Sequence, residues 1–179
     1  RVSLVGGLHL SWNGGYYWGK LVTDDRFWNS ISRTYIILIS AVTLEYIIGF
    51  GLALALWQKI KGGKFFQALF LIPMSLTPIA IGYTWRMLFH HTKGPLNDLL
   101  SYLSIPPVEW LTNAQTAIIP IIFVDVWHWT PFVFLIMYAA LQSFPLTLLE
   151  AARIDGASKM VLFFRILFPI LWPSSMAAI

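Results

Sequence analysis

The sequence contains no cysteine among its 179 residues, and only 11% of the residues are charged. The lack of cysteine excludes disulfides, thiolate metal sites and a cysteine nucleophile. The low charge, with 58% hydrophobic residues and a mean hydropathy of +0.69, argues against a soluble globular domain, which typically carries about 25% charged residues. It also argues against a disordered chain and against a nucleic-acid-binding module. The composition therefore indicates a polytopic membrane protein.

Several short motifs are also missing from the sequence. It has no phosphate loop of the Gly-x-x-x-x-Gly-Lys-Ser/Thr type, so we do not expect it to bind ATP by that route. It has no Gly-x-Ser-x-Gly or His-Glu-x-x-His element either. The chain starts at Arg1 rather than Met, shows no signal peptide, and ends at Ile179 within an apolar run. We therefore expect a fragment of a longer protein.

Apolar stretches predict the spans at residues 34–57, 65–89 and 116–141, and a fourth begins at 160 and continues to 179. The first stretch would form a helix of about 36 Å, which exceeds a hydrocarbon core of about 30 Å. Pro73 and Pro78 predict a kink or break in the second. The expected fold class is all-α, a polytopic transmembrane helical bundle with about four spans, and residues 1–179 are expected to form a single, partial transmembrane domain.

Basic residues predict the orientation of these spans. Residues 58–64 contain three lysines, and the stretch 142–165 adds Arg153, Lys159 and Arg165. The positive-inside rule places these two stretches in the cytoplasm, and it places the connections 1–33 and 90–115 outside. We predict that both outer connections are loops.

Small residues in the first span suggest close helix packing. Gly49 and Ala53 are four residues apart, as are Gly51 and Ala55, and this spacing allows helix backbones to approach closely. The alternative is that these small residues face lipid.

The connector at 142–159 predicts a short cytoplasmic helix followed by a bend. Thr147 and Glu150 have capping-box spacing, so a helix can begin there. Gly156 can end that helix in a left-handed conformation, and Ser158 can cap the next one. Ala151 and Ala152, flanked by charged residues, form a smooth surface that suits docking onto a soluble partner. An ordinary amphipathic loop helix is the alternative.

The same connector resembles the EAA loop of permeases from binding-protein-dependent ABC importers. The resemblance rests on Glu150-Ala151-Ala152, Asp155-Gly156-Ala157, Phe164, Ile166, Pro169 and Pro173. Further elements resemble the sugar branch of this family, of the maltose and glycerol-phosphate type: Phe27-Trp28-Asn29, Leu71-Ile72-Pro73, Gly94-Pro95-Leu96-Asn97 and Trp110-Leu111. The similarity extends from about residue 8 to residue 179.

This resemblance implies a transport subunit that imports a sugar or related carbohydrate by alternating access. The implied partners are ABC ATPase subunits, a second permease subunit and an extracytoplasmic solute-binding protein, in addition to membrane lipid. ATP would be bound by the ATPase, so the chain itself would have no cofactor and no catalytic residue. The implied location is the bacterial or archaeal cytoplasmic (inner) membrane, as a multi-pass protein. The implied ATPase-coupling residues are Glu150, Ala151, Ala152, Asp155, Gly156 and Ala157.

Polar side chains within the spans are candidates for the substrate path. They are Glu45, Tyr46, Tyr83, Asp125, His128 and Thr130. A charged side chain at the centre of a membrane helix costs roughly 2.5–3.5 kcal/mol, so it normally faces a cavity or a partner. Buried hydrogen bonds between helices are the alternative role for these residues, and exposure to lipid is a third.

Three other functions remain open at this stage. The chain can belong to an importer of a non-sugar solute, or it can form a channel by self-assembly. It can also be an intramembrane enzyme in which Asp125 and His128, three residues apart on one helix face, act as an acid/base pair. The adjacent His90 and His91 are interpreted as interfacial histidines rather than a metal site, because neighbouring helical residues point about 100° apart.

Overall fold

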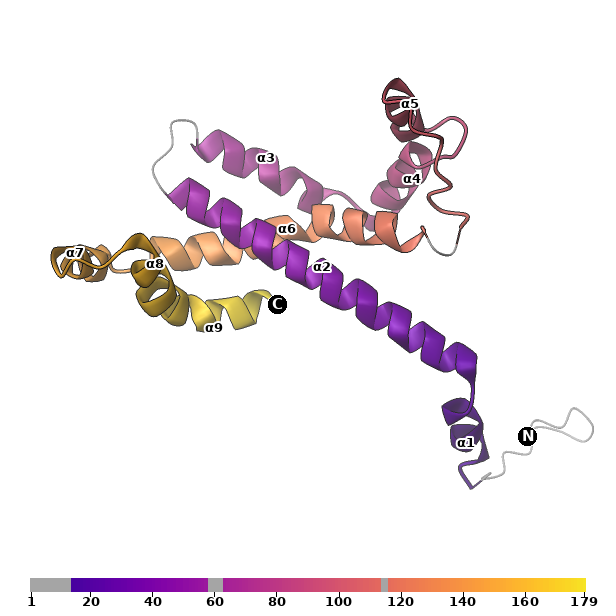
Figure 1. Ribbon diagram of the computed structural model, residues 1–179, viewed down its shortest axis with the longest axis horizontal. Coiled ribbons are helices and arrows are strands. Elements are labelled where there is room, and N and C mark those ends of the chain that lie inside the picture. The colour runs from indigo at the N-terminus through magenta and orange to yellow at the C-terminus, as the bar shows by residue number, and fades with distance from the viewer. Residues whose placement is uncertain (1–13, 58–62, 114–115) are drawn as a thin grey trace, which may run out of the picture. The chain divides into compact units, whose positions relative to one another are not determined.

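The computed structural model describes residues 14–57, 63–113 and 116–179, and every regular element in these ranges is helical (Figure 1). This confirms the predicted all-α fold class. The helices divide into two compact units, one ending at Leu38 and one from Ile39 to Ile179. The boundary lies within the long helix α2 (Asp25–Trp57). The predicted basic turn at 58–62 lies outside the described residues.

The first unit contains α1 (Tyr16–Val22) and the beginning of α2. The Asp24 carboxylate accepts a hydrogen bond from the Arg26 N–H at 2.8 Å, and the Trp28 indole N–H donates to the Val22 carbonyl at 2.7 Å. The prediction of a loop over residues 1–33 is therefore wrong where the structure describes it. Residues 25–48 contain neither glycine nor proline, so the helix of the first span extends back to Asp25.

The second unit contains the remaining elements. They are the rest of α2, then α3 (Gly63–Ser75), α4 (Pro78–Leu88), α5 (Pro95–Tyr102), α6 (Ile118–Gln142), α7 (Leu146–Ile154), α8 (Lys159–Val161), the π-helical η1 (Leu162–Leu167) and α9 (Phe168–Ala178). Three helices in the described ranges are long and apolar enough to cross a membrane: α2, α6 and the continuous helix Lys159–Ala178. A fourth crossing requires α3 and α4 together.

A sharp break separates α3 from α4. The two helices are bent by 94°, so the second predicted span is broken rather than merely kinked. Pro78 occupies the first turn of α4, and Thr77 before it is extended at φ −71° and ψ 142°. A proline disfavours the α conformation in the preceding residue, which explains why the helix stops at this point.

The core of the second unit lies where α2 and the last helix, Lys159–Ala178, pack on α6. Ala53 on α2 is fully buried, as are Phe134 and Met137 on α6. A Cβ atom placed on Gly49 would lie 2.9 Å from the Val133 Cβ, so only glycine permits this approach. The pair Gly49 and Ala53 therefore packs against α6. The second small-residue pair (51 and 55) is exposed, and a Cβ at position 51 would meet nothing within 4 Å.

The predicted outer loop at 90–115 contains the helix α5 and is organised by one buried amide. The Asn97 amide nitrogen donates to the carbonyls of His91 (2.7 Å) and Val108 (3.0 Å). Its oxygen accepts from the Val108 N–H at 3.1 Å and from the Trp110 indole N–H at 2.9 Å. These bonds fold residues 91–110 around α5, so the prediction of a loop is wrong for Pro95–Tyr102.

The last helix contains a π-helical turn. The Phe168 N–H bonds to the Phe163 carbonyl, five residues back, instead of the usual four. Pro169 follows directly, and a proline ring lacks an N–H and clashes with the carbonyl four residues before it. The wider turn separates the ring from the Arg165 carbonyl and keeps the segment helical.

Candidate functional site

Helix α7 begins two residues earlier than a helix capped by Thr147 would. Pro145 occupies the N-cap position with extended backbone angles, and no side chain caps this end. Thr147 lies within the first turn and cannot act as the N-cap, so the predicted capping box with Glu150 is wrong. Pro145 sets the boundary instead, because its fixed φ and missing N–H are tolerated only at the start of a helix.

The end of α7 is a Schellman motif. The Ala157 N–H donates to the Ala152 carbonyl at 3.0 Å, and the Gly156 N–H donates to the Arg153 carbonyl at 3.1 Å. Gly156 has φ +77°, as its predicted role as a left-handed stop requires. The next helix starts immediately, because the Ser158 hydroxyl accepts from the Val161 N–H at 3.4 Å. The predicted sequence of helix, glycine bend and capped helix is therefore present.

The surface of α7 is small, apolar and uncovered. None of its residues is buried, and Ile154 is 86% exposed. Glu150, Ala151 and Asp155 are exposed as well, whereas Ala152 is half-buried. The helix therefore presents a narrow face edged by carboxylates, which is suited to a groove on a partner.

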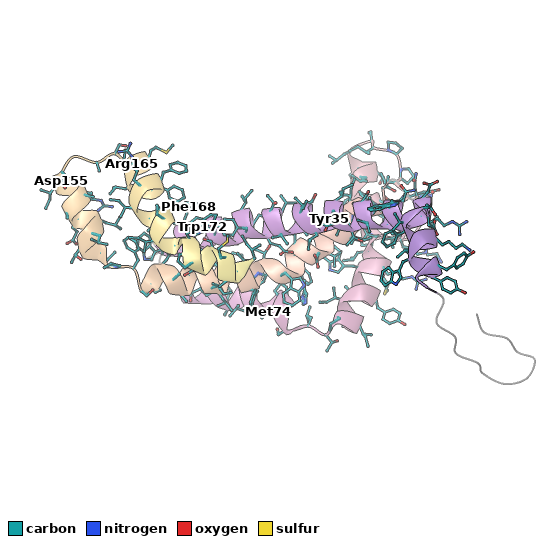
Figure 2. All side chains as sticks on the ribbon, turned by 90° about the horizontal axis from the view of Figure 1, so that it is seen from below. Tyr35, Met74, Asp155, Arg165, Phe168 and Trp172 are labelled. Carbon is teal, nitrogen blue, oxygen red and sulfur yellow. The ribbon has the colours of Figure 1, made fainter. Side chains whose placement is uncertain are left out.

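Helix α7 lies at one end of the second unit, and α4 and α5 lie at the other end (Figure 1). Figure 2 shows Asp155 at the same end as α7, with Arg165, Phe168 and Trp172 following along the next helix. The long helices α6 and Lys159–Ala178 run back from α7 into the core. A force applied to α7 therefore acts on the first turns of a span.

Two of the substrate-path candidates make hydrogen bonds between helices. The Tyr46 hydroxyl on α2 lies 2.7 Å from the Ser175 hydroxyl on α9. Ser175 is itself buried and donates to the Leu171 carbonyl at 3.0 Å. The Nδ1 atom of His128 on α6 lies 3.0 Å from the Pro73 carbonyl on α3. A carbonyl can only accept, so His128 donates to a carbonyl near the broken end of α3, which otherwise accepts only a 3.3 Å bond from the Leu76 N–H.

The other four candidates are not brought together into one polar pocket. Glu45 on α2 is buried, and Asp125 on α6 is half-buried. Tyr83 on α4 is 66% exposed. Thr130 on α6 is 8% exposed, and its hydroxyl has no hydrogen-bond partner in the described part of the chain.

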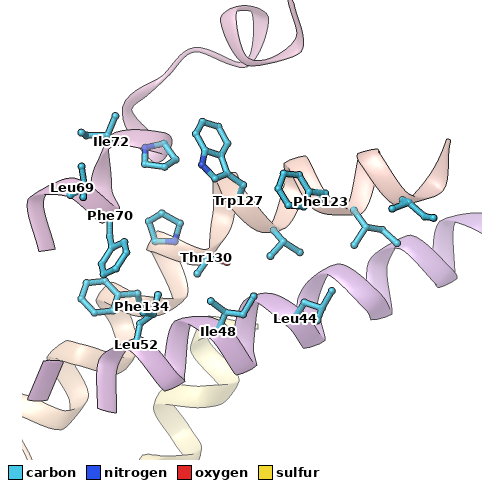
Figure 3. A pocket seen from close by; sticks show the side chains of 15 residues that line it. Leu44, Ile48, Leu52, Leu69, Phe70, Ile72, Phe123, Trp127, Thr130 and Phe134 are labelled. Carbon is cyan, nitrogen blue, oxygen red and sulfur yellow. The ribbon is translucent and has the colours of Figure 1, made fainter. Parts of the chain in front are cut away.

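A cavity of about 810 Å³ lies between α2, α3 and α6 (Figure 3). Its walls are almost entirely apolar, and Figure 3 shows Leu44, Ile48, Trp127 and Phe134 around Thr130. A sugar requires several hydrogen-bond partners, and this cavity supplies one hydroxyl. We therefore do not assign the cavity to a sugar.

Replacing His128 with phenylalanine is expected to destabilise the protein. The half-buried Pro73 carbonyl would keep only a 3.3 Å bond from the Leu76 N–H, and a typical hydrogen bond contributes about 0.5–1.5 kcal/mol to stability. His128→Gln, which keeps an N–H donor, should lose less. Thermal unfolding of the detergent-purified protein, followed by tryptophan fluorescence, measures both variants. Equal melting temperatures for the two variants would contradict a hydrogen-bonding role.

Two residues with clear structural roles carry weak sequence signals. Asn97 is only part of a four-residue motif, and its four hydrogen bonds depend on distant loop residues. Ser175 is a single small polar residue in an apolar helix, and nothing near it in sequence indicates Tyr46 as its partner. A polar residue within an apolar helix is a general signal for helix contacts, but it does not identify the partner.

Comparison with known proteins identifies the family. Residues 47–179 match the family described as "Binding-protein-dependent transport system inner membrane component". The chain belongs to this family. The match includes α7, the Schellman motif and all the described helices from the end of α2 onward. It confirms the family predicted from the EAA-like loop and the predicted location in the inner membrane.

Several curated relatives of this family member are carbohydrate permeases. It is 36% identical over 160 residues to the trehalose/maltose transport system permease protein MalF of Thermococcus litoralis, covering 89% of this chain and 54% of the relative. It is 30% identical over 161 residues to the xylose/arabinose import permease protein XacH of Haloferax volcanii, covering 90% and 51%. It is 31% identical over 153 residues to the sn-glycerol-3-phosphate transport system permease protein UgpA of Escherichia coli, covering 84% and 50%. The chain thus spans about half the length of these relatives.

Solved structures support the same fold. A chain of a bacterial alginate ABC transporter, crystallised with an alginate pentasaccharide-bound periplasmic protein, matches with a TM-score of 0.80 at 22% identity, covering 89% of this chain and 56% of that chain. A chain of a bacterial ABC transporter involved in alginate import matches with a TM-score of 0.82 at 21% identity, covering 93% and 59%. At this identity the likeness establishes the shared fold of the permease chain.

Proposed function

We propose that this chain is the membrane-spanning part of an ABC importer that translocates a sugar or related carbohydrate by alternating access. The observation that carries the proposal is the α7 loop: an exposed helix, a Schellman stop at Gly156 and a capped span directly after it. This loop occurs in a chain whose family consists of membrane components of binding-protein-dependent transport systems. Residues 1–179 are proposed to form one partial transmembrane permease domain.

The proposed coupling residues are Glu150, Ala151, Ala152, Asp155, Gly156 and Ala157. In this proposal the exposed face of α7 docks onto an ATPase subunit, and closure of two ATPase subunits displaces α7. Since α7 connects directly to α6 and to the helix Lys159–Ala178, the displacement tilts these spans. Catalysis takes place in the ATPase, and this chain acts as the transport subunit.

The substrate class is inferred from relatives. Their names specify trehalose and maltose, xylose and arabinose, and sn-glycerol-3-phosphate, which are all polyhydroxylated solutes. We propose the buried carboxylate Glu45 on α2 and the half-buried Asp125 on α6 as the groups of this chain that meet the hydroxyls of such a solute. An ionised carboxylate accepts hydrogen bonds, and the hydroxyls of such a solute can donate them. Tyr46 and His128, which already bond to other helices, are assigned to positioning the helices.

The remaining proposed partners are an extracytoplasmic solute-binding protein and a second permease subunit, which would complete the path across the membrane. An importer of a non-sugar solute has the same architecture and differs only in the uptake result. For the intramembrane enzyme, the one hydrogen bond seen for His128 joins its Nδ1 atom to the Pro73 carbonyl, which is a contact that holds α6 against α3. A channel leaves the exposed face of α7 without a role.

A transport assay with α7 variants tests the proposal. The permease containing this chain is co-expressed with its ATPase, second permease and binding protein in cells that lack uptake of the tested sugars. We expect ATP-dependent uptake of one or more labelled carbohydrates, and Glu150→Lys should abolish both uptake and co-purification of the ATPase. Asp98→Lys makes a similar charge change at an exposed site on α5, at the opposite end of the unit, and should leave ATPase binding intact. Uptake that is unchanged in Glu150→Lys would contradict the coupling role of α7.

A further inference from the structure

A second cavity lies beside α7, on the side of the helix that faces the spans. Its volume is about 880 Å³. Most of its lining is apolar and comes from the last turns of α2, the connector before α7, and the start of the helix Lys159–Ala178: Leu54, Trp57, Phe144, Leu162, Phe163 and Leu167. We name this cavity the α7 groove.

Charged side chains stand at the α7 groove. Arg153 near the end of α7 and Lys159 at the start of α8 line it, together with Glu150. Both cations are exposed, and neither side chain has a carboxylate partner among the described residues. The groove thus combines two unpaired positive charges and a single negative charge with an apolar interior.

The α7 groove lies beside the end of the span α2 and the start of the span Lys159–Ala178. Trp57 is the last residue of α2, and Leu162 and Phe163 belong to the first turns of the last span. Tryptophan at a span end is typical of the headgroup region of a membrane. The positive-inside rule places this end in the cytoplasm, where anionic lipids and juxtamembrane basic residues attract each other.

We infer that the α7 groove binds an anionic phospholipid of the cytoplasmic leaflet, with the phosphate between Arg153 and Lys159 and an acyl chain along the apolar lining. Charge complementarity favours a phospholipid over two other occupants of the groove. An apolar helix from a partner would leave both cations without a counter-charge. A free anion would leave the apolar walls in contact with water. The lipid fills the space between α7 and the spans and leaves the outer face of α7 free. The inference does not depend on which solute is transported.

Lipid retention by the purified membrane complex tests the inference. The complex is titrated in detergent with phosphatidylglycerol or with phosphatidylcholine, and bound lipid is counted by native mass spectrometry. We expect the wild type to retain phosphatidylglycerol in preference to phosphatidylcholine. The double variant Arg153→Gln/Lys159→Gln should bind phosphatidylglycerol about tenfold more weakly or worse, since each basic residue near a membrane surface contributes to the attraction.

The matched control is Arg165→Gln, which removes an exposed cation from the same span outside the groove. This control variant should retain phosphatidylglycerol as the wild type does. The control variant and the wild type should also have the same melting temperature in phosphatidylcholine. Equal retention of the two lipids by the wild type, or full retention by the double variant, overturns the inference. Displacement of the lipid by an equal concentration of free glycerol 1-phosphate also overturns it, because it shows a soluble-anion site. If the double variant loses the ATPase or the second permease while its lipid retention is unchanged, the groove holds a protein partner and the inference is overturned.

Failure of this experiment leaves the transport proposal unaffected, because lipid retention is measured without transport. Failure of the uptake assay likewise leaves the lipid site unaffected. The two results are therefore distinguishable.

Discussion

The variant Gly49→Leu is expected to lose about 2–3 kcal/mol of stability, because α2 and α6 touch at this glycine. A Cβ atom at position 49 would lie 2.9 Å from both the Cβ and the Cγ1 of Val133, and 3.0 Å from the backbone nitrogen of Phe134. A backbone atom cannot move aside as the end of a flexible side chain can, so the two helices must separate. Their separation would loosen the core around Ala53 and Met137.

The expected decrease in melting temperature for Gly49→Leu is about 5–10 °C for a chain of this size. Tryptophan fluorescence of the purified protein during heating measures it, and the sequence supplies nine tryptophans as probes. Gly51→Leu is the matched control, two residues along the same helix, where a Cβ would meet nothing within 4 Å. Equal melting temperatures for the two variants would show that the close helix crossing does not contribute to stability.

The second large effect is expected at Gly156, where the backbone is left-handed at φ +77°. A residue with a Cβ pays about 1–2 kcal/mol in this conformation, and a β-branched residue is disfavoured most. Gly156→Val should therefore disrupt the Schellman bonds from Ala157 and from residue 156 itself. If α7 docks onto the ATPase as proposed, loss of these bonds changes the orientation of α7 and weakens ATPase binding about tenfold.

Co-purification of the ATPase and sugar uptake measure the effect at Gly156. The matched control is Gly156→Asn, because asparagine tolerates the left-handed region and should retain most of the binding. No atom lies within 4 Å of a Cβ at this position, so a difference between the two variants reports on backbone conformation and not on a clash. Similar ATPase binding by the valine, asparagine and wild-type proteins would contradict the requirement for the bend.

Local chemistry accounts for the parts of the site that were predictable. The left-handed Gly156 and the Ser158 cap depend on residues within five positions of each other, so their roles follow from residue type and spacing. The start of α7 was not predicted correctly, because Pro145 and Thr147 both offer plausible boundaries and only one can be the N-cap. The helical structure of residues 16–22 was likewise not predicted, because glycines and acidic residues around it resemble a loop.

Distant contacts decided the roles that spacing left open. Tyr46 and Ser175 are 129 residues apart, and His128 and Pro73 are 55 apart, so no sequence pattern connects them. Once the helices pack, these polar groups satisfy one another in an apolar environment where an unpaired group is costly. The same packing separates two glycines that spacing made equivalent: Gly49 faces α6, and Gly51 faces outward.

By itself, the sequence determined that this is an all-helical membrane protein and that a capped bend follows a short exposed helix. It also indicated the permease family through the residues of that bend. Hydropathy and helix capping act over one helix or a few neighbouring residues, so they can be read along the chain. The tertiary structure decided three features: the 94° angle between α3 and α4, the partners of the polar side chains, and the groove between α7 and the spans. These features depend on which helix faces are brought into contact, and that is settled only when the helices pack together.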